Sequence, residues 1–192
     1  MLETFDKDRE GVVLRIERSS IHDGEGLRTV VFLKGCPLRC QWCSTPESQS
    51  FQVERAGENT YGSRMTVGEV MREIRKDSLF YFISTGGLTL SGGEILDNLL
   101  RTNQLEKCPR LVVRTPIIPG INDDPRELED VGRFCARLNW LDHVELLPYH
   151  KLGTATYEKL GRPYLLGHVP TPAPEQMEAC RNVVRRYVKT VR

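Results

Sequence analysis

The chain has 192 residues, of which 39% are hydrophobic and 28% charged, and its formal net charge is +1. This length supports a substantial core. Because positive and negative charges nearly balance, the composition gives no reason to expect a nucleic acid or a membrane surface as partner. No apolar run approaches the roughly 18–20 residues that span a bilayer, and the charged start "MLETFDKDREG" lacks the apolar stretch of a signal peptide. We therefore expect a cytoplasmic protein, in which clustered cysteines bind metal more often than they form disulfides.

Two strands are predicted at the start of the chain, followed by a long loop. Residues 11–20 ("GVVLRIERSS") and 27–35 ("LRTVVFLKG") are rich in β-branched residues, and the segment "IHDGEG" between them has the composition of a turn. Residues 44–64 are polar and show no clear period, so we expect a loop there.

A helix and a third strand are predicted next. Thr66 and Glu69 form a capping box, which marks a helix start. The apolar residues that follow at helical spacing are Val67, Val70, Met71 and Ile74. The segment "LTLSGGE", residues 88–94, predicts a short strand that ends in a glycine turn.

The second half of the chain predicts helices that alternate with strands. Residues 95–108 ("ILDNLLRTNQLEKC") predict a helix, residues 110–118 ("RLVVRTPII") a buried strand, and residues 143–149 ("HVELLPY") another strand. Two further helices have proline near their first position. One begins with Asp124 as cap, Pro125, and Glu127 as capping-box acid, and turns Leu128, Val131, Cys135 and Leu138 to one face. The other begins at Pro174 and directs Met177, Cys180, Val184 and Tyr187 or Val188 inward.

This alternation predicts an α/β fold with a parallel sheet, in a single domain that spans residues 1–192. In parallel architectures the functional site lies at the carboxyl ends of the strands. The segments "KGC", "SGGE", "RTP" and "PYH" all lie at such ends, so we expect them to share one pocket.

Three of the six cysteines, Cys36, Cys40 and Cys43, fall within eight residues. A closed structural zinc site and an ordinary iron–sulfur cluster both take four ligands. Three thiols therefore indicate an iron–sulfur cluster with one iron open to a substrate or cofactor. The alternatives are a zinc site completed by His22 or Cys108, and three thiols without a metal.

The remaining cysteines have ordinary explanations. Cys135 and Cys180 lie on the apolar faces of predicted helices, where a thiol behaves as a small hydrophobic group. Cys108 follows a predicted helix and precedes a strand, so its role stays open.

The segment "CPLRCQWC" resembles the C-x3-C-x2-C signature of the radical S-adenosylmethionine (SAM) superfamily, including the aromatic Trp42 before the last cysteine. The wider stretch "IHDGEGLRTVVFLKGCPLRCQWCSTPESQ" resembles the opening of the glycyl-radical-enzyme activating enzymes, the group that contains pyruvate formate-lyase activase. The later blocks "MTVGEVMREI", "GGLTLSGGE", "LVVRTPIIPGINDD" and "ELLPYHKLG" resemble that family in the expected order. The resemblance therefore extends over most of the chain.

The resemblance implies a set of cofactor contacts. Cys36, Cys40 and Cys43 would hold a [4Fe–4S] cluster, and SAM would chelate the fourth iron. The residues implied around SAM are Trp42, Ser91, Gly92, Gly93, Glu94, Arg114 and His150. Taken alone, "SGGE" is more typical of a simple strand-to-helix turn, and a single histidine is more often a structural hydrogen bonder. Asp23 and Arg28 flank the turn before the cysteines and are either part of the entrance or solvated charges.

The family fold is a partial (β/α)6 barrel, and the chain departs from it after Glu94. Two βα units of about 30 residues each are expected between Glu94 and the helix that follows, and neither is present. The ferredoxin-like insert that many activases carry is absent as well. Either the sequence joins the two sides of an omitted segment near 94–95, or the units are truly deleted. We expect the first, because a four-stranded remnant would expose apolar edges and be unstable or dimeric.

The function that the resemblance implies is activation of a glycyl radical enzyme under anaerobic conditions. Reductive cleavage of SAM would give a 5′-deoxyadenosyl radical, which abstracts hydrogen from a backbone glycine of the partner enzyme. The electron would come from flavodoxin or ferredoxin, and the family suggests a monomer. Two alternatives remain: a radical SAM enzyme that acts on a small molecule, and an iron–sulfur or zinc protein without SAM chemistry.

Overall fold

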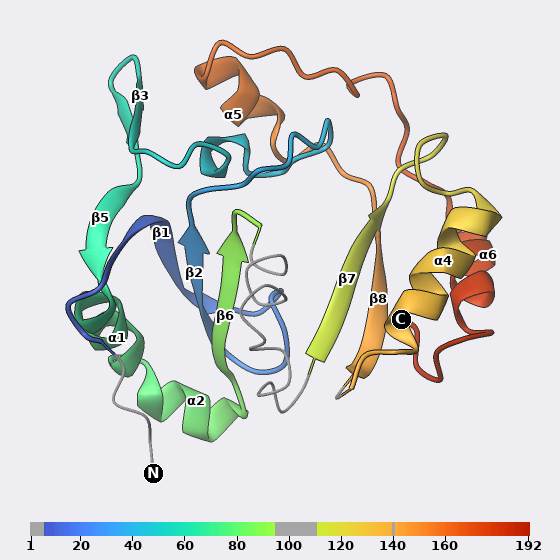
Figure 1. Cartoon of the computed structure of the whole chain (residues 1–192), viewed down its shortest axis with the longest axis horizontal. Coiled ribbons are helices and arrows are strands. Elements are labelled where there is room, and N and C mark those ends of the chain that lie inside the picture. Colours follow the sequence, from blue (N-terminus) through green and yellow to red (C-terminus); the bar gives the residue numbers. More distant parts are fainter. Residues whose placement is uncertain (1–5, 95–110, 140) are drawn as a thin grey trace. The chain divides into compact units, whose positions relative to one another are not determined.

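The computed structural model describes residues 6–94, 111–139 and 141–192, which form two compact units (Figure 1). One unit, called the cysteine unit below, contains residues 6–94 together with 153–164. The other, called the C-terminal unit, contains the described residues of 111–152 together with 165–192. Both units combine strands with helices, so the structure has the mixed α/β class that the sequence predicts.

The cysteine unit is built on a four-stranded sheet in the order β5-β1-β2-β6 (Figure 1). These strands span Ser63–Thr66, Glu10–Ser20, Arg28–Leu33 and Gly87–Gly92. The predicted strands around residues 11–20, 27–35 and 88–94 are confirmed. The sheet is mixed rather than parallel, because β1 runs antiparallel to both β2 and β5, while β2 and β6 are parallel.

The turn between β1 and β2 explains the antiparallel pair. Gly24 has a φ of 129° and Gly26 a φ of 69°, in the region that side chains disfavour. Two glycines so close together let the chain reverse within a few residues. The sequence analysis expected a parallel sheet. Strands β1 and β2 are antiparallel because a short turn connects them, and no crossover helix lies between them.

Helix α1 (Val67–Arg75) follows β5 and has the predicted capping box. The hydroxyl of Thr66 accepts the Glu69 N–H, and the Glu69 carboxylate accepts the Thr66 N–H. Ile74 packs with Val13 and Val31 in the core of this unit. A second helix, α2 (Ser78–Ser84), was not predicted. Several of its apolar side chains are exposed, so it lacks the buried face that helical spacing identifies.

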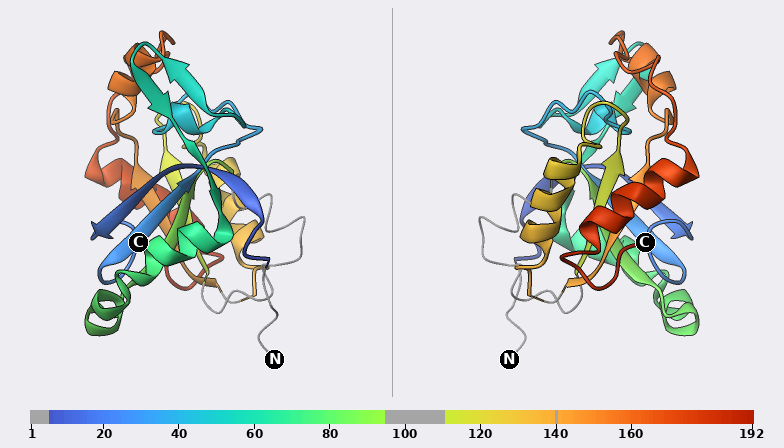
Figure 2. Two further views of the ribbon diagram at one scale, coloured as in Figure 1. Left: turned by 90° about the vertical axis from the view of Figure 1, so that its left-hand side faces the viewer. Right: turned by 90° about the vertical axis from the view of Figure 1, so that its right-hand side faces the viewer.

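The prediction of a loop over residues 44–64 was wrong in part. A short 3-10 helix, η1 (Pro46–Ser48), is followed by a hairpin of β3 (Glu54–Ala56) and β4 (Asn59–Tyr61). Figure 2 shows this hairpin in teal, extending away from the sheet. Its strands are polar and at most half-buried, so backbone hydrogen bonds rather than apolar burial define them. Hydrophobic periodicity therefore gave no signal.

The C-terminal unit pairs β7 (Leu111–Ile117) with β8 (Leu141–Pro148) in parallel. Helices α4 (Pro125–Cys135) and α6 (Pro174–Val184) belong to the same unit as these two strands, and both begin at the predicted prolines. Asp124 caps α4 by accepting the Arg126 N–H. Strand β7 is half-buried for most of its length rather than fully buried as predicted. The short helix α5 (Thr154–Lys159) was not predicted and lies in the cysteine unit.

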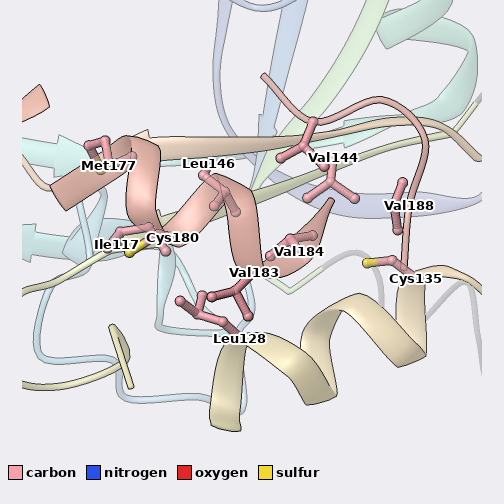
Figure 3. Packing of buried hydrophobic residues seen from close by; sticks show 11 residues of the cluster. Ile117, Leu128, Cys135, Val144, Leu146, Met177, Cys180, Val183, Val184 and Val188 are labelled. Carbon is pink, nitrogen blue, oxygen red and sulfur yellow. The ribbon is translucent and has the colours of Figure 1, made fainter. Parts of the chain in front are cut away.

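The predicted inward faces of α4 and α6 meet in one hydrophobic core (Figure 3). Cys135 and Cys180 are buried there, and burial raises the pKa of both thiols. The prediction that they are hydrophobic core residues is confirmed. The core residues labelled in Figure 3 are Ile117, Leu128, Cys135, Val144, Leu146, Met177, Cys180, Val183, Val184 and Val188.

Several predictions concern the region after Glu94. The helix expected over residues 95–108, including Cys108, lies outside the described residues. Strand β6 is the last strand in the sheet order of the cysteine unit, and its Leu88 and Leu90 are exposed. Within the described part of the chain, no helix combines the length and apolar character needed to cross a membrane.

Candidate iron–sulfur site

The three cysteines lie on a loop whose two ends are joined by backbone hydrogen bonds. The Gly35 N–H donates to the Ser48 carbonyl at 2.8 Å, and the Cys36 N–H donates to the Gln49 carbonyl at 3.1 Å. Gly35 has a φ of 104°, and a Cβ there would lie 2.7 Å from the ring of Phe51. The loop from Cys36 to Glu47 is therefore closed at its base, and the closure requires a glycine immediately before the first cysteine.

Cys36, Cys40 and Cys43 are free and half-buried. Burial raises the pKa of the Cys40 thiol, and the negative charges of Cys36 and Glu94 raise it further. Burial is also the main cause of the raised pKa of Cys43, to which Cys40 and Cys36 contribute. The three sulfurs therefore repel one another once they are ionised, and a bound cation would relieve that repulsion.

This donor set suits an iron–sulfur centre. Three thiolates on one short loop are soft ligands, and they leave one position of a cubane cluster open. Among residues 6–94, 111–139 and 141–192, no group of three His, Cys, Asp or Glu side chains has an arrangement ready to hold a metal ion. His22, the alternative zinc ligand, is exposed on the turn between β1 and β2.

The "SGGE" segment lies beside the base of the cysteine loop. The parallel register pairs Leu33 with Gly92, and the Gly93 N–H donates to the Leu33 carbonyl at 2.9 Å. A Cβ on Gly92 would lie 2.2 Å from the Leu33 oxygen, and one on Gly93 would lie 2.1 Å from the Gly35 oxygen. Both glycines are therefore needed for the end of β6 to approach the chain that enters the loop. Glu94 follows directly and is close enough to influence Cys40.

Asp23 and Arg28 tie the turn before β2 to strand β6. The Thr89 hydroxyl donates to the Asp23 carbonyl at 2.9 Å, and the Arg28 guanidinium donates to the Thr89 hydroxyl at 2.6 Å. Arg28 also donates to the Leu88 carbonyl at 2.5 Å. These polar contacts hold the turn in place, so Arg28 is more than a solvated charge.

The sequence analysis missed a set of charged side chains, several of them buried, at the base of the loop. The Lys34 side chain is fully buried, donates to the Glu47 carbonyl and lies 3.2 Å from the Glu54 carboxylate. Arg15 lies 2.9 Å from the buried carboxylate of Glu47. One signal was present: a lysine between an apolar strand and the first cysteine needs a partner if it is buried.

Residues 153–164 also pack on the cysteine loop (Figure 1, orange beside η1). A Cβ on Gly153 would lie 2.9 Å from the Cys43 carbonyl oxygen, so the backbones approach closely. Tyr157 is buried nearby, and its pKa is raised by burial and then by the negative charge of Cys43. No sequence motif predicted this contact, because it joins residues more than a hundred positions apart.

Arg114 and His150 lie in the C-terminal unit. Arg114 on β7 forms an ion pair with Glu145 on β8 at 2.7 Å, so its charge has the partner that an apolar strand requires. His150 follows β8, is exposed, and accepts the Leu152 N–H at Nδ1 over 3.4 Å. Trp42 is half-buried on the cysteine loop. The structure thus brings the cysteines and "SGGE" together, while the SAM roles of Trp42, Arg114 and His150 stay predictions.

Comparison with known proteins shows which class the chain is similar to. Residues 22–114 match the family described as "4Fe-4S single cluster domain". The isethionate sulfite-lyase activating enzyme of Oleidesulfovibrio alaskensis is 28% identical, over 85% of this chain and 91% of its own length. The (2S)-3-sulfopropanediol sulfolyase activating enzyme of Bilophila wadsworthia is 26% identical, over 84% and 92%. The pyruvate formate-lyase 2-activating enzyme of Escherichia coli is 26% identical, over 94% and 91%.

These findings confirm the resemblance on which the sequence analysis depended. The chain is similar to radical SAM enzymes of the oxidoreductase type, and these similarities imply a [4Fe–4S] cluster and SAM as its cofactors. Within that class, it is similar along most of its length to the glycyl-radical-enzyme activating enzymes.

Proposed function

We propose that this protein activates a glycyl radical enzyme by hydrogen abstraction from a backbone glycine. The observation that carries the proposal is the joining of the cysteine loop to "SGGE" through parallel strands β2 and β6. This arrangement places a three-thiol site next to a glycine-rich strand end, each of which matches the family's sequence blocks. The activating-enzyme relatives support the same reading.

In this proposal Cys36, Cys40 and Cys43 hold the cluster, and the open iron receives SAM. The carboxylate of Glu94 is suited to accept hydrogen bonds from the ammonium group of SAM. Ser91, Gly92 and Gly93 shape the strand end that carries Glu94, while Trp42, Arg114 and His150 complete the SAM contacts. The partly buried loop limits access of water to the reactive centre.

Held by Cys36, Cys40 and Cys43, a reduced cluster would supply one electron for cleavage of SAM to methionine and a 5′-deoxyadenosyl radical, and that radical would take one hydrogen atom from the glycine. The electron donor is a flavodoxin or a ferredoxin. The partner belongs to the glycyl radical enzymes, and the relatives named above suggest isethionate sulfite-lyase and pyruvate formate-lyase as the first to test.

We further propose that the natural protein is a partial (β/α)6 barrel whose third and fourth units are omitted from this sequence. The alignment with the Oleidesulfovibrio relative spans 284 positions, whereas the chain has 192 residues, so at least 92 positions (284 minus 192) have no counterpart here. The position of β6 at the end of its sheet is consistent with this omission. An intact mass near 21.9 kDa for the natural protein would contradict it.

The first experiment is EPR spectroscopy of anaerobically reconstituted, dithionite-reduced protein with and without SAM. We expect a [4Fe–4S]⁺ signal that changes shape when SAM is added, because SAM occupies the open iron. Formation of 5′-deoxyadenosine and a glycyl radical on the partner would then follow. Deoxyadenosine without a glycyl radical would favour a small-molecule substrate, and a signal indifferent to SAM would contradict the enzyme proposal.

A further inference from the structure

The cysteine loop is held at its base by three charged side chains from three separate segments. Lys34 follows β2, Glu54 begins β3, and Arg162 follows α5. The two oxygens of the Glu54 carboxylate each meet one cation: Oε2 lies 3.2 Å from Lys34 Nζ, and Oε1 lies 2.7 Å from Arg162 Nη2. We call these three residues the loop clamp.

The same two cations also hold successive carbonyls of η1, the short helix that follows the last cysteine. Arg162 Nη1 donates to the Pro46 carbonyl at 3.1 Å, and Lys34 Nζ donates to the Glu47 carbonyl. These carbonyls thus have charged donors, which make stronger hydrogen bonds than neutral ones. One carboxylate therefore fixes two cations, and the two cations fix the segment into which the cysteine loop leads.

Burial makes the loop clamp interdependent. The Lys34 side chain has no exposure, and the Glu54 side chain is 23% exposed. A buried ammonium group without its carboxylate is strongly unfavourable, so Lys34 depends on Glu54. Arg162 is a guanidinium that contacts a carboxylate and a carbonyl at once, which a planar fork allows.

The loop clamp also determines where residues 153–164 lie. Gly153 at one end of this segment packs against the backbone of Cys43 and Ser44, and Arg162 anchors the other end. Between them, the buried Tyr157 lies close enough for the Cys43 and Cys40 charges to act on it. The segment is therefore fastened at both ends against the loop that carries the cysteines.

We propose that Lys34, Glu54 and Arg162 are positioning residues that hold residues 153–164 against the cysteine loop, limiting access to its thiols before the iron–sulfur cluster is assembled. This inference rests on the proposed role of the three cysteines as cluster ligands. Arg162 is the residue to test, because it contacts both Glu54 and η1 and is only partly buried.

The experiment compares Arg162→Ala, Arg162→Lys and the control Lys159→Ala in protein without a cluster. Lys159 is an exposed cation on the same segment, so its replacement makes the same charge change. Iodoacetamide alkylation is followed by peptide mass spectrometry for Cys36, Cys40 and Cys43, with the buried Cys135 and Cys180 as internal references for folding of the C-terminal unit. Hydrogen exchange over β1 and β2 reports on folding of the cysteine unit.

We expect Arg162→Ala to raise the alkylation rate of the three loop thiols about five- to tenfold, since local opening becomes more frequent when charged hydrogen bonds are lost. Arg162→Lys should recover most of the protection through Glu54, and Lys159→Ala should match the unmodified chain. After reconstitution, Arg162→Ala should also broaden the EPR signal of the reduced cluster, because the ligands are less uniformly placed.

Equal alkylation rates in Arg162→Ala and Lys159→Ala would overturn the proposal. Loss of exchange protection throughout β1 and β2 would also overturn it, because Arg162 would then serve folding as a whole. Alkylation is measured in protein without iron, so its result does not depend on cluster assembly. If the chain without substitutions took up no cluster, the proposed function would be contradicted, but the alkylation rates could still be compared.

Discussion

The carbonyl of Leu33, which belongs to the last residue pair of β2 and β6, accepts a hydrogen bond from the N–H of Gly93 over 2.9 Å. This contact brings Glu94 to the base of the cysteine loop. It joins two residues that are sixty positions apart in the sequence, and the proposed SAM site depends on it.

Replacement of Cys36 tests the cluster ligands. We expect Cys36→Ala to lose the [4Fe–4S] absorbance and EPR signal, because two thiolates do not hold a cubane cluster. The control is Cys180→Ala in the C-terminal core, which should keep its iron while losing about 1 kcal/mol of stability. Equal iron content in both variants, measured after anaerobic reconstitution, would refute the assignment.

Glu94→Gln tests the proposed contact with SAM. The amide keeps the size of the side chain but removes the charge that attracts an ammonium group, so SAM affinity should fall by about tenfold or more. The cluster itself should still assemble. Glu58→Gln in the exposed turn of the β3–β4 hairpin is the control. Titration of the SAM-induced EPR change gives the affinities, and unchanged affinity in Glu94→Gln would remove Glu94 from the site.

Gly92→Ala tests the close approach at the end of β6. Gly92 has a φ of 97°, and its new Cβ would lie 2.2 Å from the Leu33 carbonyl oxygen. Gly57→Ala is a matched control, because Gly57 has a φ of 58° with open space around it. We expect the control to cost about 1 kcal/mol and Gly92→Ala at least about 2 kcal/mol more. Urea unfolding measures both, and equal losses would show that the strand end adapts.

Asp77→Asn tests a buried carboxylate that binds side chains of strands β1 and β2. Asp77 accepts hydrogen bonds from Arg18 and from the Thr29 hydroxyl, and it is almost fully buried. In the variant, a neutral amide replaces the carboxylate that accepts from these donors. We expect the free energy of unfolding to fall by about 1–3 kcal/mol at neutral pH. Asp130→Asn on the exposed face of α4 should change stability little.

The effect of Asp77 should depend on pH with a defined sign. The Arg18 hydrogen bond, followed by that of Thr29, lowers the pKa of Asp77 in the folded protein despite its burial. A lowered folded pKa gives stability that is present above the unfolded value of about 3.9 and is lost as pH falls through the folded value. The difference in free energy of unfolding between the unmodified protein and Asp77→Asn should therefore be constant from about pH 5 to 8 and become smaller below about pH 4. A gap that grows on acidification would contradict this account.

Local patterns in the sequence determined much of this protein. The capping box at Thr66, the prolines that open α4 and α6, and the buried faces with Cys135 and Cys180 follow from interactions within a few residues. The cysteine spacing and the later blocks also sufficed to indicate the radical SAM class. Such features are readable because hydrophobic period, capping and ligand spacing are local.

Only the tertiary structure decided how these pieces meet. The reversal at Gly24 and Gly26 made the sheet mixed, and polar strands with little burial formed the β3–β4 hairpin. The loop clamp joins Lys34 and Glu54 to Arg162 across more than a hundred residues. Contacts of that kind depend on which distant backbones approach each other, and a buried charge finds its partner only when the chain has folded around it.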